Sequence, residues 1–264
     1  MTNETANETK DVIQNMQLTS DIFFGVVLED IAACEEVIRI LTGAELEIIE
    51  VKSQYSILQI ENRSVRIDIL ARDKQGSQVG IEMHPQSNED RVRRNRYNIS
   101  SMDIHSFEKG CKYTDTHNIY GIYITQADFL KTKKGINKVV RIIQNTDTEI
   151  PNGIEEYYIS LACEGSTPEQ TALLRYLKNS EGITSSKYFP NLVRRVRWLK
   201  EKKEGQDIMC EIMDGIRNEG IKMGKILGTI DLMRELQYLD VAIENKLVEK
   251  YHISQEKARA YVDR

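Results

Sequence analysis

Apolar and polar residues alternate most regularly in one short part of the chain, residues 64–86. Every second residue from Val65 to Ala71 is apolar, a pattern typical of a β-strand with one buried face. A polar segment containing Gly76 follows, and a second β-like run covers residues 79–85. Two such runs on either side of a short glycine-containing turn predict a β-hairpin.

The predicted hairpin brings two acidic residues together. With residues 74–76 as the turn, paired residues have numbers that sum to 150, so Asp68 lies opposite Glu82. His84 projects from the same face as Glu82, because side chains alternate along a strand. Like charges directly opposite one another destabilise a strand pair, and a divalent cation between them removes that repulsion. The hairpin therefore predicts a metal site.

The rest of the chain predicts helices before and after the hairpin and further strands beside it. Apolar spacing and capping residues predict the helices, whereas short β-branched or aromatic runs predict the strands. Before the hairpin we expect a helix from Ser20 and Asp21, a helix at 31–41 that ends at Gly43, and one or two strands at 46–51 and 56–60. After it we expect a helix capped by Ser87 or Asn88 and ended by Gly110, strands at 118–125 and 154–161 with a short helix or strand near 139–143, a helix capped by Thr167, helices at 191–203 and 206–217 broken at Gly205, and two short helices within 239–262, the second capped by Ser254.

These elements divide the chain into four segments. Residues 1–16 are polar, and we expect them to form a disordered leader. Residues 17–165 alternate helices and strands and predict an α/β core. Residues 166–216 predict a helical extension packed on that core. Residues 217–264 predict a marginal helical tail, since glycines recur there and each costs roughly 1 kcal/mol relative to alanine in a helix.

Composition and charge narrow the classes of function. A net charge of −5 and an isoelectric point near 5.6 argue against a protein that coats nucleic acid through bulk positive charge, although local basic patches stay open. The four cysteines include no CxxC pair, so a disulfide framework or a zinc cluster is not expected. No apolar run reaches transmembrane length and the N-terminus lacks a signal peptide, so we expect a cytoplasmic protein without membrane contact.

Two basic stretches are candidates for contact with nucleic acid. Arg91, Arg93, Arg94 and Arg96 follow the hairpin directly, and they either hold phosphates beside the metal or form a solvated helix face. A second cluster surrounds Trp198, where an exposed helix face with one aromatic packed inward is the favoured interpretation. For the last two helices, packing or self-association is favoured over a DNA-reading helix-turn-helix.

The order and spacing of several motifs resemble a known family. A helix, three strands carrying Asp68 and the Glu82-Met83-His84 triplet, a helix and a strand resemble the core of the PD-(D/E)XK nuclease fold. More narrowly, residues 17–215 resemble the recombination-promoting nuclease (Rpn) family, also called PD-(D/E)XK nuclease family transposases. The resemblance implies an α/β, restriction-endonuclease-like core with a central mixed sheet flanked by helices, plus a C-terminal helical extension. The motifs are LTSDIFFG at 18–25, VRID at 65–68, IEM at 81–83, RRNRYNISSMD at 93–103 and VRWLK at 196–200.

The resemblance also implies roles for individual residues. Asp68 matches the family's metal-binding aspartate, Glu82 matches its second carboxylate, and Met83 would contribute its backbone carbonyl as a metal ligand. His84 departs from the pattern, because the family usually has Gln there and the wider superfamily has Lys. A histidine at this position either aligns or deprotonates the attacking water, binds a metal softer than Mg²⁺, or marks a member that no longer cuts.

The function that these roles imply is a metal-dependent endonuclease that hydrolyses DNA phosphodiester bonds, linked by the resemblance to recombination, mobile elements or defence. Asp68 and Glu82 would hold Mg²⁺, or Mn²⁺, which lowers the pKa of a bound water that His84 aligns or deprotonates. Glu35 or Glu36 would be a further ligand, although a solvated helix face is favoured for both. A homodimer with two-fold symmetry would suit an enzyme that makes paired cuts.

Two other classes of function stay open. A degenerate nuclease would bind nucleic acid in a salt-sensitive way without metal-dependent cleavage. An interaction protein would assemble through its helical tail and would have no affinity for DNA. A titration with DNA, with and without Mg²⁺ or Mn²⁺, separates both from an active enzyme.

Overall fold

The computed structural model describes residues 11–57, 65–84, 90–107, 110 and 112–263. The strands of the first part of the chain are β1 (Ile48–Ile57), β2 (Val65–Asp73), β3 (Gln78–Met83), β4 (Ile119–Thr125), β5 (Ile136–Val139) and β6 (Ile154–Ser160). Its helices are α2 (Asp21–Leu28), α3 (Ile31–Thr42), α4 (Arg91–Ser106), the short 3₁₀ helix η1 (Tyr113–Asp115), α5 (Pro168–Lys178) and α6 (Pro190–Glu201).

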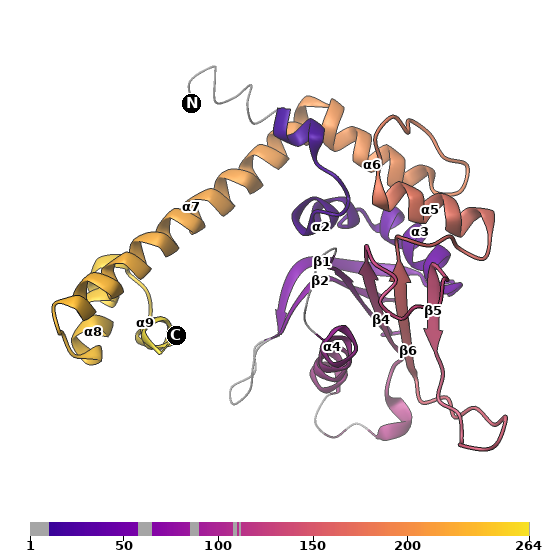
Figure 1. Ribbon diagram of the computed structural model, residues 1–264, viewed down its shortest axis with the longest axis horizontal. Helices are drawn as coiled ribbons and strands as arrows, with labels where there is room; N and C mark the ends of the chain where they lie inside the picture. Colours follow the sequence, from indigo (N-terminus) through magenta and orange to yellow (C-terminus); the bar gives the residue numbers. More distant parts are fainter. Residues whose placement is uncertain (1–10, 58–64, 85–89, 108–109, 111, 264) are drawn as a thin grey trace. The chain divides into compact units, whose positions relative to one another are not determined.

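The described strands form one mixed sheet in the order β1-β2-β3-β4-β6-β5. Strands β1, β2 and β3 pair in antiparallel fashion, β4 and β6 continue the sheet in parallel with β3, and β5 closes the far edge antiparallel to β6. Helices α2, α3, α5 and α6 lie over one face of the sheet and α4 lies over the other (Figure 1). This arrangement confirms the expected α/β fold with a central mixed sheet flanked by helices.

The central hairpin has the register that the sequence predicts. Ile69 pairs with Ile81, and Arg72 pairs with Gln78, so paired numbers sum to 150. The Asp73 carboxylate accepts a hydrogen bond of 2.7 Å from the Ser77 backbone N–H, which closes the turn. Of the one or two strands predicted before the hairpin, the structure has one continuous strand, β1, which pairs with β2.

Helix ends and connections differ from the sequence predictions at several points. Helix α4 begins after Asp90, whose carboxylate accepts a 3.0 Å hydrogen bond from the Arg93 N–H, and it ends before Phe107 rather than at Gly110. The predicted caps Ser87 and Asn88 lie outside the described residues. The segment near 139–143 contributes the end of strand β5 rather than a helix.

The break between the helices predicted at 191–203 and 206–217 falls at Lys202 and not at Gly205. Lys202 has extended backbone angles, φ −94° and ψ 142°, which no α-helix accommodates. Gly205 is instead a buried residue inside the next helix.

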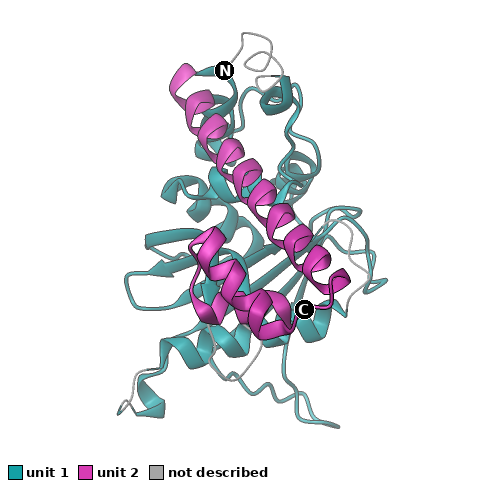
Figure 2. Ribbon diagram, turned by 90° about the vertical axis from the view of Figure 1, so that its left-hand side faces the viewer, with its two compact units in different colours: residues 1–202 teal, residues 203–264 magenta. Residues whose placement is uncertain are grey.

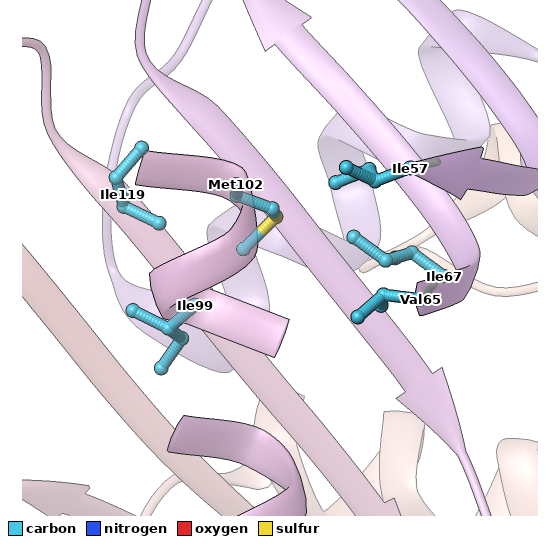
Figure 3. Close-up of a cluster of buried hydrophobic side chains, with 6 residues drawn as sticks. All are labelled: Ile57, Val65, Ile67, Ile99, Met102 and Ile119. Atoms are coloured by element: carbon cyan, nitrogen blue, oxygen red, sulfur yellow. The ribbon is translucent and has the colours of Figure 1, made fainter. Parts of the chain in front are cut away.

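Helix α4 packs closely on the sheet because two strands carry glycine beneath it. A Cβ atom at Gly121 would lie 2.4 Å from Cδ1 of Ile99, and one at Gly80 would lie 2.8 Å from Sδ of Met102. The buried cluster around these contacts joins α4 to strands β1, β2 and β4 (Figure 3). Its members are Ile57, Val65, Ile67, Ile99, Met102 and Ile119.

Glutamates 35 and 36 of α3 have structural roles. The Glu35 carboxylate accepts a 2.8 Å hydrogen bond from the Ile48 N–H at the start of β1. The Glu36 carboxylate accepts hydrogen bonds of 3.0 Å from the Asn191 N–H and 2.9 Å from the Leu192 N–H, the free donors of the first turn of α6. Neither the solvated face nor the metal ligation considered for these residues is what the structure shows.

The N-terminal segment is ordered over its described residues 11–16, although the sequence predicts a disordered leader over residues 1–16. Residues 11–15 are helical, and the Ile13 side chain is fully buried. The Lys200 ammonium donates hydrogen bonds of 2.9 Å to the carbonyl of Gln14 and 2.6 Å to that of Met16. These contacts fix residues 11–16 against α6, so the described part of the segment is ordered.

The C-terminal helices form a compact unit of their own. The chain divides into residues 1–202 and residues 203–264 (Figure 2), and the second unit contains α7 (Lys203–Glu235), α8 (Asp240–Tyr251) and α9 (Gln255–Val262). The boundary expected between 216 and 217 lies inside the continuous helix α7. Ser254 caps α9 as expected, by accepting from the Lys257 N–H. The core of the unit consists of Ile226, Ile230, Ile243, Leu247, Ala258 and Val262.

Removal of the Glu36 carboxylate tests the docking of α6. Glu36→Ala should lower the free energy of unfolding by about 1–3 kcal/mol, because two backbone donors at the start of α6 lose their acceptor. Trp198, the only tryptophan, lies on α6, so urea unfolding followed by its fluorescence reports this region. The exposed Glu45 is the control, and Glu45→Ala should change the value by less than about 0.5 kcal/mol. Equal effects of the two changes would contradict the capping role.

Candidate metal centre

Asp68 lies at the point where strands β2 and β3 separate. The ladder between them ends at the pair Ile69 and Ile81, one position before Asp68 and Glu82 would pair. Beyond that point the Met83 N–H donates a 2.9 Å hydrogen bond to Oδ2 of Asp68 instead of to the β2 backbone. The Asp68 side chain thereby takes the place of a ladder bond, and it is held next to β3 with only 5% of the residue exposed.

Glu82 is the more deeply buried of the two acids, with 2% of its surface exposed. Its Oε2 atom lies 2.8 Å from Nε2 of His84 and 3.7 Å from Nη2 of Arg94 on α4. Its Oε1 atom is buried and has no hydrogen-bond partner among the described residues. A buried carboxylate oxygen without a partner is costly, so this atom marks a position where a further positive or donor group fits.

The side chains of Asp68, Glu82 and His84 form one cluster. Each offers a ligand atom, and the three atoms lie within 4.8 Å of one another. Two carboxylate oxygens at this separation suit a divalent cation such as Mg²⁺ or Mn²⁺, and the imidazole nitrogen suits Mn²⁺ or a softer metal. Together with the unpartnered Oε1 of Glu82, this donor set fits a metal ion. The sequence prediction that these side chains meet is therefore matched by the geometry.

The electrostatics of Asp68 show how unfavourable the cluster is without a cation. Burial, and after it the charge of Glu82, raise the pKa of the Asp68 carboxyl to about 6. The hydrogen bond from Met83 and the nearby His84 act against this rise. A metal ion between the two acids would favour the ionised form and reverse the effect.

His84 is held in place from two sides. Its backbone N–H donates a 2.9 Å hydrogen bond to the Ile124 carbonyl, which continues the pairing of β3 with β4. Its ring stacks on that of Tyr123, with centroids 5.4 Å apart and planes inclined by 26°. With Nε2 directed at Glu82, the Nδ1 atom has no partner among the described residues. The side chain is 23% exposed, so solvent reaches it.

The four arginines of α4 do not form one cluster. Arg94 contacts the metal centre, through Glu82. The Arg91 guanidinium lies 5.1 Å from the ring centre of Phe129, and Arg93 pairs with Asp90 at 3.2 Å while staying 78% exposed. Arg96 is exposed. A helix turns by 100° per residue, so arginines at four nearby positions necessarily face different surroundings.

Two residues near the centre were not singled out by the sequence. Gln54 donates a 3.2 Å hydrogen bond from Nε2 to Oδ1 of Asp68, from a position in β1 with a positive φ of 49°. Asp21, in the first turn of α2, is near enough for its charge to contribute to the raised pKa of Asp68. Nothing in their sequence spacing relates either residue to the hairpin. The sequence signal for Asp21 was its place in the LTSDIFFG motif of the family resemblance, where it was interpreted only as part of a helix start.

The fold and the acidic cluster define a class of protein. A mixed sheet with helices on both faces, and two acids on neighbouring central strands, are the features of a PD-(D/E)XK nuclease core. The family model described as PD-(D/E)XK nuclease family transposase matches residues 38–179, which include the whole hairpin. The chain belongs to this family.

The other comparisons add no closer relative. No curated protein and no solved structure matches the chain significantly. Among the described residues, every helix is either too short or too polar to cross a membrane.

Because the pKa of Asp68 is raised, replacing Asp68 by a neutral residue should increase the free energy of unfolding by an amount that depends on pH. The folded protein binds the Asp68 proton more tightly than the unfolded chain, so ionisation costs stability as the pH rises from about 4 to about 6. In EDTA at pH 8, Asp68→Asn should therefore raise the free energy of unfolding by up to roughly 3 kcal/mol, and the gain should vanish near pH 4. Urea unfolding followed by Trp198 fluorescence measures both values.

An exposed aspartate provides the control for this measurement. Asp147→Asn should give no gain at either pH, because Asp147 is exposed and lies far along the chain from the hairpin. A gain from Asp68→Asn that is equal at pH 4 and pH 8 would contradict the electrostatic origin.

Proposed function

We propose that this protein is a metal-dependent endonuclease that hydrolyses DNA phosphodiester bonds. One observation carries the proposal: the carboxylates of Asp68 and Glu82 converge within 4.8 Å while Oε1 of Glu82 stays buried without a partner. A protein that kept these acids for stability alone would be expected to pair them fully, since unpaired buried charge is strongly unfavourable. Membership of a nuclease family supports the same activity.

The proposed cofactor is Mg²⁺, with Mn²⁺ as an alternative. Asp68 and Glu82 would be its side-chain ligands, and the backbone carbonyl of Met83 a third. A bound divalent cation lowers the pKa of water and stabilises charge that develops on a phosphate. The protein's own contribution is to orient the two carboxylates, through the Met83 N–H and Gln54 on Asp68 and through His84 and Arg94 on Glu82.

In the proposed reaction His84 would act on the attacking water and Arg94 on the phosphate. A neutral His84 that donates from Nε2 to Glu82 leaves Nδ1 as an acceptor, which can align an attacking water or take its proton. Arg94 is 32% exposed, and its planar guanidinium has a shape that suits a phosphate. Arg91, Arg93 and Arg96 are proposed to contact the DNA backbone more loosely, with little sequence selectivity. A cytoplasmic location and a two-fold dimer are proposed as well.

A second candidate function rests on the surroundings of Glu82. Oε2 of Glu82 already faces His84 and Arg94, and an arginine close to a buried acid can replace a cation. The protein would then be a degenerate nuclease that binds nucleic acid without cutting it. The 3.7 Å separation of Arg94 and Glu82 is longer than a close charge-assisted hydrogen bond, which favours the enzyme.

Removal of the second carboxylate is the direct test of the enzyme. Glu82→Ala should lower Mg²⁺-dependent nicking of plasmid DNA by about 10²–10³-fold or more, because a metal ligand is lost. Mg²⁺ should also raise the melting temperature of the parent protein and of the Glu45→Ala control, but not that of Glu82→Ala. Unchanged nicking by Glu82→Ala would rule the assignment out. DNA binding without nicking or metal stabilisation in the parent protein would establish the binding module.

Replacement of His84 separates its two proposed roles. His84→Gln should retain nicking within about tenfold, because the Gln amide oxygen can accept a hydrogen bond from water as Nδ1 does. His84→Ala, which offers no acceptor, should be about 10²-fold slower or worse. If His84→Gln is as slow as His84→Ala, the histidine must take the proton and not merely align the water.

A further inference from the structure

A groove of about 350 Å³ runs along helix α6, outside the residues that the family model matches. One wall is a single face of the helix, which presents Pro190, Val193, Arg194, Arg197, Trp198 and Glu201 at intervals of one to four residues, and the other is the loop at residues 184–186. Lys202 lies at the C-terminal end of the groove. We call this feature the α6 groove. It lies wholly within the first unit of the chain.

The α6 groove carries an excess of positive charge. Arg197 is neutralised by Glu201, because its Nε and Nη2 atoms each donate a 2.8 Å hydrogen bond to that carboxylate. Arg194 and Lys202 are exposed and form no ion pair within the described part of the chain. Two unpaired cations, one near each end of the groove, therefore favour an anionic ligand.

The positions of the two cations set the length of that ligand. Arg194 and Lys202 are eight residues apart, and a rise of about 1.5 Å per helical residue separates their attachment points by roughly 12 Å. Both side chains are long, but a single small anion such as phosphate would engage only one of them readily. An extended chain of anions fits the spacing better.

Trp198 gives the groove an aromatic surface between the two cations. Arg195 covers part of the indole, with its guanidinium carbon 4.9 Å from the ring centre, but Arg195 does not line the groove. Indole in the groove wall therefore remains open to a ligand. Nucleic-acid bases stack on such rings irrespective of sequence.

The loop wall is fixed before any ligand binds. The Ser186 hydroxyl accepts hydrogen bonds of 3.2 Å from the Tyr188 N–H and 3.3 Å from the Phe189 N–H. The Thr184 carbonyl accepts a 3.4 Å hydrogen bond from Arg197 across the groove. A preformed groove loses little conformational entropy on binding, which favours a real site over an incidental crease.

We infer that the α6 groove binds an unpaired strand of nucleic acid. A base stacks on Trp198, and backbone phosphates on either side of it contact Arg194 and Lys202. Duplex bases are stacked on one another and cannot offer a face to the indole, so the groove selects single strands. This contact goes beyond the proposed cleavage at Asp68 and Glu82, and it is measured without metal and without cutting, so either proposal can fail alone.

Trp198 is itself the probe for the test, since it is the only tryptophan of the chain. Titration of the full chain in EDTA with an oligothymidylate of about ten nucleotides should quench its fluorescence. The double variant Arg194→Ala with Lys202→Ala should bind at least tenfold more weakly. Loss of two phosphate contacts should also reduce the slope of log affinity against log salt by about 1.4. Lys178→Ala, which removes an exposed cation of α5, is the matched control and should bind like the parent protein.

Three results would overturn the inference. The first is the absence of quenching in the parent protein, and the second is equal quenching in the double variant and the parent. The third is stronger quenching by a duplex of the same length, or by polyglutamate, which would assign the groove to duplex DNA or to an acidic protein segment. Both replaced side chains are exposed, and an unchanged urea unfolding curve shows that the double variant folds.

Discussion

The structure is organised around the electrostatic repulsion between two buried acids that the fold holds close together. Asp68 and Glu82 are buried side by side at the point where two strands separate, and burial together with mutual repulsion raises the pKa of Asp68 to about 6. Hydrogen bonds from Met83 and Gln54 hold one acid, while His84 and Arg94 approach only one oxygen of the other. The remaining oxygen of Glu82 has no partner within the described residues. Such an arrangement is unfavourable for stability and suited to a cation, which is the usual compromise at a functional site.

The rest of the first unit can be understood as support for this arrangement. Glycines in β3 and β4 allow α4 to lie close to the sheet, and the same helix carries Arg94 to Glu82. Strand β4 supplies Tyr123, which stacks on His84 and limits the motion of its ring. On the other face, Glu36 of α3 caps α6 and fixes the helix that forms the α6 groove. The metal centre and the α6 groove thus both lie within the first unit of the chain.

The position of Arg94 relative to Glu82 distinguishes the proposed enzyme from the proposed binding module. If its guanidinium moved fully onto Glu82, it would satisfy the acid and compete with a metal ion. At 3.7 Å it lies beside Oε2 of Glu82, while Oε1 has no hydrogen-bond partner within the described residues. A phosphate arriving at the site would offer the arginine a second anion, so substrate and metal would assist each other's binding by drawing Arg94 and Glu82 apart.

The sequence by itself determined the hairpin, its register and therefore the meeting of Asp68 with Glu82, because a period-two apolar pattern and a short turn leave one way to pair the strands. It also determined the caps at Thr167 and Ser254, which depend on neighbouring residues only. Tertiary structure alone decided the roles of Gln54 and Glu36 and the contact of Arg94 with Glu82. Each of these depends on which distant segment lies opposite, and no local pattern of apolar and polar residues encodes that choice.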